Sequence, residues 1–286
     1  MPYNIPIEQA KAAYPEYTFI TALTPSEQKA AFHVIDNSSR KPLCLKLISP
    51  DYPIERLDRE IQALQQISHP NIVSFVDYTR SIVCGTQRHH IIEEFIDGND
   101  LSVFLTPGKR WQVNITAHFF AAICDGLMAI HKLGIVHRDL KPSNIRIRTD
   151  GQPVIIDFGV ARHLTKPDLT RFSQGAKFGT PLYFSPEQCC GTREDIDHRT
   201  DLFAIGILIF QALTGRHPFD LGTSMTLQDL YGAICTSEAY LQFPEFASIT
   251  RNFQLLVTRL LEKERARRPQ DAAQVATLLR KIGGAS

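Results

Sequence analysis

Two short stretches near the middle of the chain carry the side chains best suited to chemistry. The first is residues 137–144, with the sequence HRDLKPSN, and the second is residues 157–159, with the sequence DFG. They combine carboxylates that can accept a proton, a lysine that can neutralise an anion, and carboxylate and amide oxygens of the kind that bind Mg²⁺. Any one of these residues could lie in a surface turn. Surface turns do not explain both stretches in this order, with the apolar run 154–156 leading into the second.

The two stretches resemble the protein-kinase family, whose catalytic loop reads H-R-D-x-x-x-x-N and whose metal-binding motif is D-F-G. The resemblance implies that Asp139 orients and deprotonates an acceptor hydroxyl and that Lys141 lies near the transferring phosphoryl group. It implies ATP and Mg²⁺ as cofactors, with Asn144 and Asp157 holding the metal. Asp139, Lys141 and Asn144 are therefore the expected catalytic residues.

An upstream lysine and a carboxylate extend the resemblance to the nucleotide. Lys46, in the run Leu-Cys-Leu-Lys, resembles the strand lysine that contacts the α- and β-phosphates, and Glu60 matches the helix carboxylate that positions it. A lone lysine or glutamate is usually a solvated surface charge, but Lys46 lies among apolar residues of an expected strand. Counting back from Asp97-Gly98 places the hinge at residues 94–96. The expected ATP-binding residues are Lys46, Glu60, Glu94, Ile96, Asp100 and Asp157.

The downstream run 179–187, GTPLYFSPE, resembles the end of a kinase activation segment, with Ser-Pro-Glu in place of the usual Ala-Pro-Glu. The resemblance implies that Glu187 pairs with Arg268 and that Asp201 holds the backbone of the catalytic loop. Buried carboxylates need partners of this kind. The Pro-Glu-Gln that closes the segment resembles bacterial members of the family.

Lys141 and Thr180 resemble serine/threonine kinases and not tyrosine kinases, so the expected acceptor is a serine or threonine hydroxyl of a protein. A phosphate on Thr170 or Ser173 would pair with Arg138 and order the activation segment through charge-assisted hydrogen bonds. The alternative is that these hydroxyls only solvate a loop.

Apolar periodicity divides the elements that must position these residues into two groups. Short apolar runs separated by turn-forming residues predict strands at 19–23, 30–35, 43–48, 72–78 and 90–95. Apolar residues spaced three and four apart predict helices at 54–67, 115–133, 201–214, 227–236, 253–264 and 271–282. The first ninety or so residues are thus expected to be mostly strand, and the rest mostly helix.

The resemblance covers residues 17–282 and implies a single protein kinase domain over 1–286 with a two-lobed α+β fold. The expected small lobe, residues 17–96, is an antiparallel sheet with one helix, and the larger helical lobe is residues 97–286. The resemblance places ATP in a cleft at the hinge. No internal repeat and no long Pro/Gly/Ser linker interrupts the chain.

Composition narrows the expected partners and location. Lysine plus arginine number 31 and aspartate plus glutamate 30, so the charge balance gives no reason to expect a nucleic acid. The apolar run 203–213 is shorter than the roughly 20 residues that span a bilayer, so no membrane span is expected. The six cysteines form no C-x-x-C pair, which favours reduced thiols in the cytoplasm. The oligomeric state stays open.

Three features depart from the family pattern. The loop at residues 23–32, where the family has its phosphate-binding glycines, contains no glycine, and Pro25 removes one backbone donor. Within it, Glu27 brings a negative charge towards the expected triphosphate, and Lys29 could partly offset that charge. Glu93 takes the usually apolar gatekeeper position. Arg146 replaces an apolar residue under the adenine, and strand alternation would point it towards the nucleotide.

An unpaired charge at either of these last two positions would be costly, so both side chains are expected to be paired, solvated or turned outwards. An active serine/threonine kinase is the first interpretation. The alternative is a pseudokinase that acts as a protein-binding scaffold with weak or no use of nucleotide, which the missing glycines, Glu93 and Arg146 favour. A small-molecule phosphotransferase is third, because the long activation segment suits a protein substrate.

Overall fold

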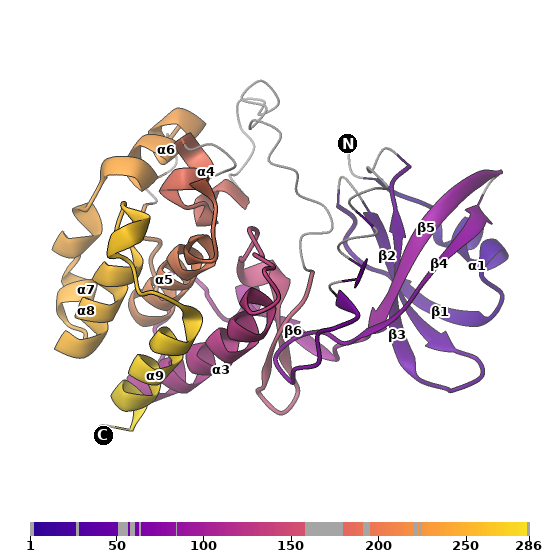
Figure 1. Ribbon diagram of the computed structural model, residues 1–286, viewed down its shortest axis with the longest axis horizontal. Helices are drawn as coiled ribbons and strands as arrows, with labels where there is room; N and C mark the ends of the chain where they lie inside the picture. Colours follow the sequence, from indigo (N-terminus) through magenta and orange to yellow (C-terminus); the bar gives the residue numbers. More distant parts are fainter. Residues whose placement is uncertain are drawn as a thin grey trace. The chain divides into compact units, whose positions relative to one another are not determined.

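The computed structural model describes residues 3–26, 29–50, 57, 61–62, 64–83, 85–157, 180–190, 195–219, 222 and 225–284. The chain forms two compact units, Met1–Asp97 and Gly98–Ser286, called here the first and the second unit (Figure 1). The first is mostly strand and the second mostly helix, so the expected α+β fold class is confirmed.

An antiparallel sheet of five strands, in the order β1-β2-β3-β5-β4, builds the first unit. The strands are β1 (Tyr17–Ala22), β2 (Lys29–Asp36), β3 (Pro42–Ile48), β4 (Phe75–Val83) and β5 (Thr86–Glu94). The middle strand, β3, is buried from Leu43 to Ile48. Its register places Lys46 opposite Ala31 of β2 and Ile91 of β5, so the lysine lies in the middle of the sheet.

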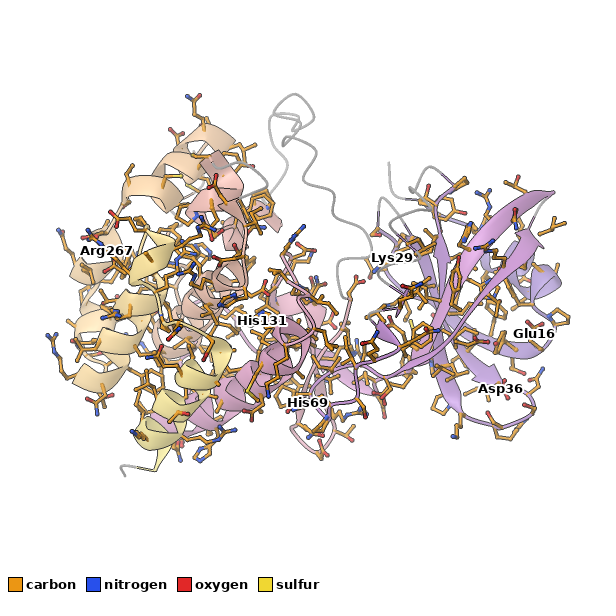
Figure 2. All side chains as sticks on the ribbon, viewed as in Figure 1. Glu16, Lys29, Asp36, His69, His131 and Arg267 are labelled. Carbon is orange, nitrogen blue, oxygen red and sulfur yellow. The ribbon has the colours of Figure 1, made fainter. Side chains whose placement is uncertain are left out.

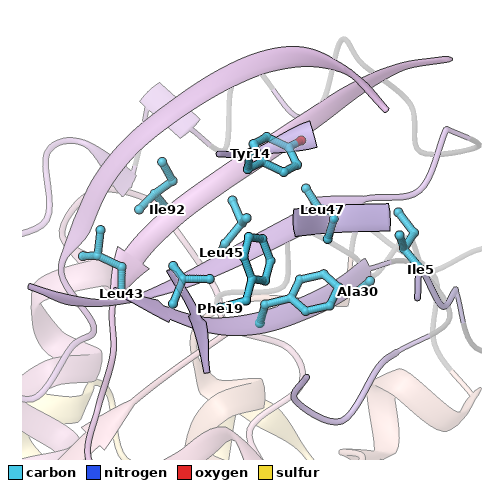
Figure 3. Packing of buried hydrophobic residues seen from close by; sticks show 11 residues of the cluster. Ile5, Tyr14, Phe19, Ala30, Leu43, Leu45, Leu47 and Ile92 are labelled. Carbon is cyan, nitrogen blue, oxygen red and sulfur yellow. The ribbon is translucent and has the colours of Figure 1, made fainter. Parts of the chain in front are cut away.

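A short N-terminal helix, α1 (Ile7–Ala13), contributes to the core of the first unit and has no counterpart in the expected elements. Ala10 of this helix and the flanking Ile5 and Tyr14 are buried in one apolar cluster with the inward side chains of β1, β2 and β3 (Figure 3). The Tyr14 hydroxyl accepts a hydrogen bond from the hydroxyl of Ser81 in β4 at 2.6 Å. Figure 1 shows α1 beside the sheet, and its contacts are with β1 and β4.

The helix expected at residues 54–67 falls only partly within the described residues. Leu57, Ile61 and Leu64 are helical and buried, which is the three-and-four spacing that an apolar face requires. Glu60, the expected partner of Lys46, lies outside the described residues.

Helices of the second unit surround α5, which is buried nearly all round. The α-helices are α3 (Val113–His131), α4 (Pro186–Cys190), α5 (Arg199–Thr214), α6 (Leu227–Thr236), α7 (Pro244–Ala247), α8 (Arg251–Leu260) and α9 (Ala272–Gly283). Short 3₁₀ turns are η1 (Leu101–Val103), η2 (Pro142–Asn144), η3 (Thr180–Tyr183), η5 (Ala239–Gln242) and η6 (Arg265–Arg267). Gly206 lets α5 approach the end of α8 closely, because a Cβ there would lie 2.8 Å from the Cβ of Leu260.

A small sheet of three strands, β6 (Gly98–Asp100), β7 (Ile145–Arg148) and β8 (Pro153–Ile155), adjoins the catalytic loop in sequence. Gly98 has φ 139°, and a Cβ there would collide with the carbonyl oxygen of Ile147, so this position requires glycine.

Within the described part of the chain, α3 is the one helix long and apolar enough to cross a membrane by length and composition. In its most apolar window 56% of the residues are buried in the protein, and α3 packs against α9. Core helices meet the same criterion, so the expectation that the chain has no membrane span stays a prediction.

Candidate active site

The backbone of the catalytic loop is held in a strained conformation by Asp201 at the start of α5. Arg138 has φ 63°, a region that costs a non-glycine residue on the order of 1–3 kcal/mol. The carboxylate of Asp201 accepts hydrogen bonds from the backbone N–H groups of His137 and Arg138, at 2.9 and 2.8 Å. From the other side, the Gln188 side-chain amide donates to the Arg138 carbonyl oxygen at 2.7 Å. The predicted role of Asp201 is confirmed.

His131, at the end of α3 and labelled in Figure 2, completes this support. Its Nε2 lies 2.8 Å from Oδ2 of Asp201. Burial raises the pKa of Asp201, but the hydrogen bonds that it accepts from His131 and from the backbone N–H of Arg138 outweigh burial, so the pKa lies below its ordinary value. The carboxylate is therefore ionised at neutral pH and holds the loop with charge-assisted hydrogen bonds.

The expected catalytic residues lie together on this loop. Lys141 Nζ donates a hydrogen bond to Asp139 Oδ2 at 2.9 Å. The Asn144 amide nitrogen donates to the backbone oxygen of Asp139 at 2.8 Å and to its Oδ2 at 3.2 Å. The side chains of Asp139 and Lys141 are 13% and 21% exposed, so both stay within reach of a substrate. A lysine held beside the carboxylate can neutralise an anion that approaches it.

Asn144 and Asp157 fit the Mg²⁺ that the resemblance implies. Because the amide nitrogen of Asn144 is committed to Asp139, its side-chain oxygen is the atom left to act as a ligand. The N–H of Ile156, just before Asp157, donates to the Asn144 carbonyl oxygen at 2.9 Å and ties the two segments together. Asp157 has φ 68°, which aspartate tolerates better than most residues. Amide and carboxylate oxygens are suitable ligands for Mg²⁺.

Lys46 is buried in β3, where it pairs with the carboxylate of Glu93. Glu93, the first of the two charges that depart from the family pattern, therefore has a partner. The Lys46 Nζ lies 2.5 Å from Glu93 Oε2, and the two side chains are 9% and 5% exposed. Burial lowers the pKa of Lys46, but Glu93 outweighs it, so the pKa lies above its ordinary value. Lys46 is therefore a protonated cation, as contact with phosphates requires.

Arg146, the second charge that departs from the family pattern, is paired in the small sheet. It lies opposite Asp100 in the register of β6 and β7, and its Nη1 donates to Asp100 Oδ1 at 3.0 Å. It also donates to the carbonyl oxygen of Gly98. Asp100 thus has a structural partner, and the nucleotide contact assigned to it stays a prediction.

The hinge residues Glu94 and Ile96 lie at the end of the first unit. The Glu94 carboxylate accepts hydrogen bonds from the backbone N–H and the hydroxyl of Ser74, at 2.9 and 3.0 Å, and Ile96 is 3% exposed. With the Glu94 side chain committed to Ser74, contact with an adenine at this position falls to the backbone. The structure does not test that contact.

The glycine-free loop, called here the hairpin turn, joins β1 and β2, and three of its described N–H groups bond within the protein. The Ser26 N–H donates to the Lys29 carbonyl at 2.9 Å, and the Leu23 N–H to the Ala31 carbonyl at 2.8 Å. The Lys29 N–H donates to the Ser26 hydroxyl oxygen at 3.2 Å. Glu27 lies outside the described residues. These three donors are therefore not directed at a phosphate, in contrast to the role of a glycine-rich loop.

The predicted ion pair between Glu187 and Arg268 is confirmed. Two hydrogen bonds of 2.7 Å join the guanidinium and the carboxylate, and the arginine side chain is 0% exposed. The Thr200 hydroxyl also donates to the carboxylate. Burial raises the pKa of Glu187, but Arg268 and Thr200 outweigh it, so the pKa lies below its ordinary value. The candidate phosphosites Thr170 and Ser173 lie outside the described residues.

Comparison with known proteins decides the family. Residues 27–278 match the family model described as the protein kinase domain. The chain belongs to the protein kinase family. Curated bacterial kinases are similar over much of the chain. Serine/threonine-protein kinase pkn2 of Myxococcus xanthus is 37% identical over 235 residues, which are 79% of this chain and 27% of that protein.

Two further kinases are similar to this one. Serine/threonine-protein kinase pkn3 of Myxococcus xanthus is 31% identical over 79% of this chain and 41% of that protein. The probable serine/threonine-protein kinase PknB of Lactococcus lactis is 34% identical over 59% of this chain and 26% of that protein. The chain thus spans about a quarter to two fifths of the length of these relatives. The expected resemblance to bacterial serine/threonine kinases, which use ATP with Mg²⁺, is confirmed.

Sequence reasoning missed several residues that shape this kinase site. His131 could have been noticed as a polar residue in the last turn of an otherwise apolar helix, and Gln188 as the residue after the Ser-Pro-Glu motif. Ser74, which binds the hinge carboxylate, carries no signal in the sequence.

Proposed function

We propose that this protein kinase transfers the γ-phosphate of ATP to serine and threonine hydroxyls of proteins. The observation that carries the proposal is the placement of Asp139, Lys141 and Asn144 on one loop whose strained backbone Asp201 holds. Phosphoryl transfer depends on positioning and electrostatics, and this loop supplies both.

Each side chain has a distinct part in the transfer. Asp139 takes the proton of the acceptor hydroxyl, and Lys141 holds that carboxylate and neutralises charge on the transferred group. Lys46, kept protonated by Glu93, binds phosphate oxygens of the nucleotide. Asn144 and Asp157 would hold Mg²⁺, which neutralises phosphate charge when bound.

A transfer assay tests the proposal. Wild-type protein, Asp139→Asn and a control, Asp125→Asn, are incubated with γ-labelled Mg-ATP and a generic basic protein. Asp125 lies on α3 in a partly exposed ion pair with Arg280, so its replacement tests for a general effect of losing a carboxylate. We expect label on the protein with the wild type and with Asp125→Asn, and at most background label with Asp139→Asn.

Two results would contradict the proposal. Equal label with Asp139→Asn would remove Asp139 from the catalytic role. No label with any variant, together with no shift of the melting temperature on adding Mg-ATP, would favour the pseudokinase scaffold, which the internally bonded hairpin turn would suit. Labelling of aminoglycosides or sugars in place of protein would point to a small-molecule phosphotransferase.

We further propose phosphorylation at Thr170 or Ser173 and a location in the cytoplasm. Mass-spectrometric mapping of wild type and Asp139→Asn after incubation with ATP tests the first, and the absence of phosphate at both positions would exclude it. The described cysteines are free thiols, which suits a reducing compartment. Fractionation of cells that carry the tagged protein tests the second.

A further inference from the structure

Three cysteines meet where α4 and α6 pack together in the second unit. Cys189 and Cys190 end α4, and Cys235 lies in the last turn of α6. The sulfur atoms of Cys190 and Cys235 are 3.0 Å apart, and Cys189 also forms a hydrogen bond with Cys235. All three are free thiols. We call this group the thiol cluster.

A lysine lies beside the thiol cluster, and burial lowers its pKa to about 8. Lys263 Nζ donates to the carbonyl oxygen of Ile234, the residue before Cys235, at 2.8 Å, and lies 4.3 Å from the ring centre of Phe219. The pKa of Cys235 is lowered, first because Cys189 donates a hydrogen bond to it, and then through Cys190 and Lys263, while burial and Glu187 act in the opposite direction.

The pKa values of the two α4 cysteines shift in the opposite direction to that of Cys235. The hydrogen bond with Cys235 raises the pKa of both thiols. Of the three, Cys235 is therefore the thiol whose surroundings favour the thiolate. A thiolate near a cation in a partly exposed site is the reactive form of cysteine. Cys190 is exposed and Cys235 half-buried, so a small oxidant can reach the pair.

We propose that Cys190 and Cys235 form an oxidation-sensitive pair that a hydroperoxide converts into a disulfide. The Cys235 thiolate attacks the outer peroxide oxygen, the O–O bond breaks and Cys235 becomes a sulfenic acid, while the leaving alkoxide or hydroxide takes a proton from solvent. The Cys190 sulfur then attacks the Cys235 sulfur, the S–O bond breaks, and water leaves with the thiol proton. Two thiols are oxidised and one peroxide is reduced, and a dithiol reverses the change.

The disulfide would act on the catalytic loop through α4. A disulfide requires its sulfurs about 2.05 Å apart, so the 3.0 Å separation must close by roughly 1 Å. The preceding residues of α4 are Gln188, which holds the carbonyl of Arg138, and Glu187, which pairs with Arg268. Because α4 is anchored on both sides, closing the disulfide strains the contact between Gln188 and the loop. We expect oxidation to lower the transfer rate, a consequence that rests on the proposed function.

Peptide mapping under non-reducing conditions tests the pair directly. Wild type, Cys190→Ser and Cys235→Ser are treated with hydrogen peroxide, alkylated and digested. We expect a Cys190–Cys235 disulfide in the wild type, reversed by dithiothreitol. Cys124 is the control within the same molecule, because it is fully buried and burial raises its thiol pKa, so it should stay unmodified.

Iodoacetamide at neutral pH should modify Cys235 faster than Cys124, and Lys263→Met should slow that reaction severalfold.

The results of these experiments test the disulfide between Cys190 and Cys235 separately from the proposed kinase function. Unlinked Cys190 and Cys235 at peroxide concentrations that oxidise other thiols would overturn the pair, as would a disulfide that joins Cys189 to Cys235 instead. A disulfide that forms while wild-type transfer stays unchanged would overturn the regulation. Support would be a severalfold loss of transfer in oxidised wild type that is absent from Cys190→Ser. If the wild type transfers no phosphate before oxidation, the proposed function fails, and the mapping still decides the pair.

Discussion

Truncation of Arg268 to alanine should be among the most destabilising changes in the second unit. The guanidinium makes two hydrogen bonds to the Glu187 carboxylate and three more to the carbonyl oxygens of Arg199, Glu262 and Lys263. Its side chain is 0% exposed and that of Glu187 is 6% exposed. Arg268→Ala therefore leaves a buried carboxylate and buried carbonyl groups without their main donor.

The size of the effect follows from this burial. Removing one partner of a buried ion pair costs about 3–5 kcal/mol. In a unit of this size, each kcal/mol moves the melting temperature by about 2–4 °C, so the expected fall is about 6–20 °C. Arg267→Ala is a matched control one residue away. Its ion pair with Glu264 has side chains 64% and 67% exposed, and such a pair contributes at most about 1 kcal/mol.

Calorimetry of wild type, Arg268→Ala and Arg267→Ala at neutral pH measures the difference. The reasoning is refuted if Arg268→Ala lowers the melting temperature no more than Arg267→Ala. If Arg268→Ala does not fold, Arg268→Lys keeps the charge but loses the paired hydrogen bonds, and an intermediate fall is expected.

The pH dependence gives a second check on the same pair. Because the pKa of Glu187 is lower in the folded protein, the stability from its charge is fully present above its unfolded pKa, about 4.3. That stability is lost as the pH falls through the folded pKa. The difference between wild type and Arg268→Ala should therefore be largest near neutral pH and shrink below about pH 4. A difference that grows in acid would contradict this interpretation.

Three further substitutions test the site. Glu93→Leu removes the carboxylate that keeps buried Lys46 protonated, so we expect a lower melting temperature and a smaller rise on adding Mg-ATP than in the wild type, measured by thermal shift. Arg146→Leu should change the melting temperature by less than about 4 °C, because its pair with Asp100 is partly exposed, and should lower KM for ATP in the transfer assay. Asp201→Asn should lower kcat at least tenfold with less effect on KM for ATP, because it loosens the loop that positions the catalytic carboxylate.

Periodicity predicted the main elements because their apolar residues must face one core. The helix expected at 201–214 is Arg199–Thr214 in the structure, and the strand expected at 43–48 is Pro42–Ile48. Periodicity failed for α1, whose seven residues include one buried residue, Ala10, because so short a segment cannot show an apolar face. Its position depends on Ile5 and Tyr14 on either side, which pack on the sheet as flanking residues and not as part of a helical pattern.

Glu93 and Arg146, the two charges that depart from the family pattern, are both paired in the structure. Their partners could not be predicted from the sequence, because the partners depend on strand register. In the ladder of β3 and β5, Cys44 lies opposite Glu93, so Lys46, two residues further, is the diagonal neighbour of Glu93 on the same face. A shift of one residue would send the two side chains to opposite faces. Arg146 faces Asp100 by the same rule in β6 and β7. Sequence identifies such a charge, but only the pairing of strands identifies its partner.

These pairings change how the departures from the family pattern bear on function. Glu93 is part of the environment that keeps Lys46 protonated, so this departure favours the phosphate contact predicted for Lys46. The hairpin turn is different, since three of its described N–H groups bond within the protein and offer no comparable compensation. Binding of the triphosphate must then depend on side-chain charge and on Mg²⁺ more than in a kinase with a glycine-rich loop. The attraction that Lys46 and a bound Mg²⁺ would exert is weakened by salt, whereas aligned backbone donors close to a phosphate are weakened less. We therefore expect the missing glycines to lower the affinity for ATP, and the geometry of Asp139 and Asn144 to govern the transfer.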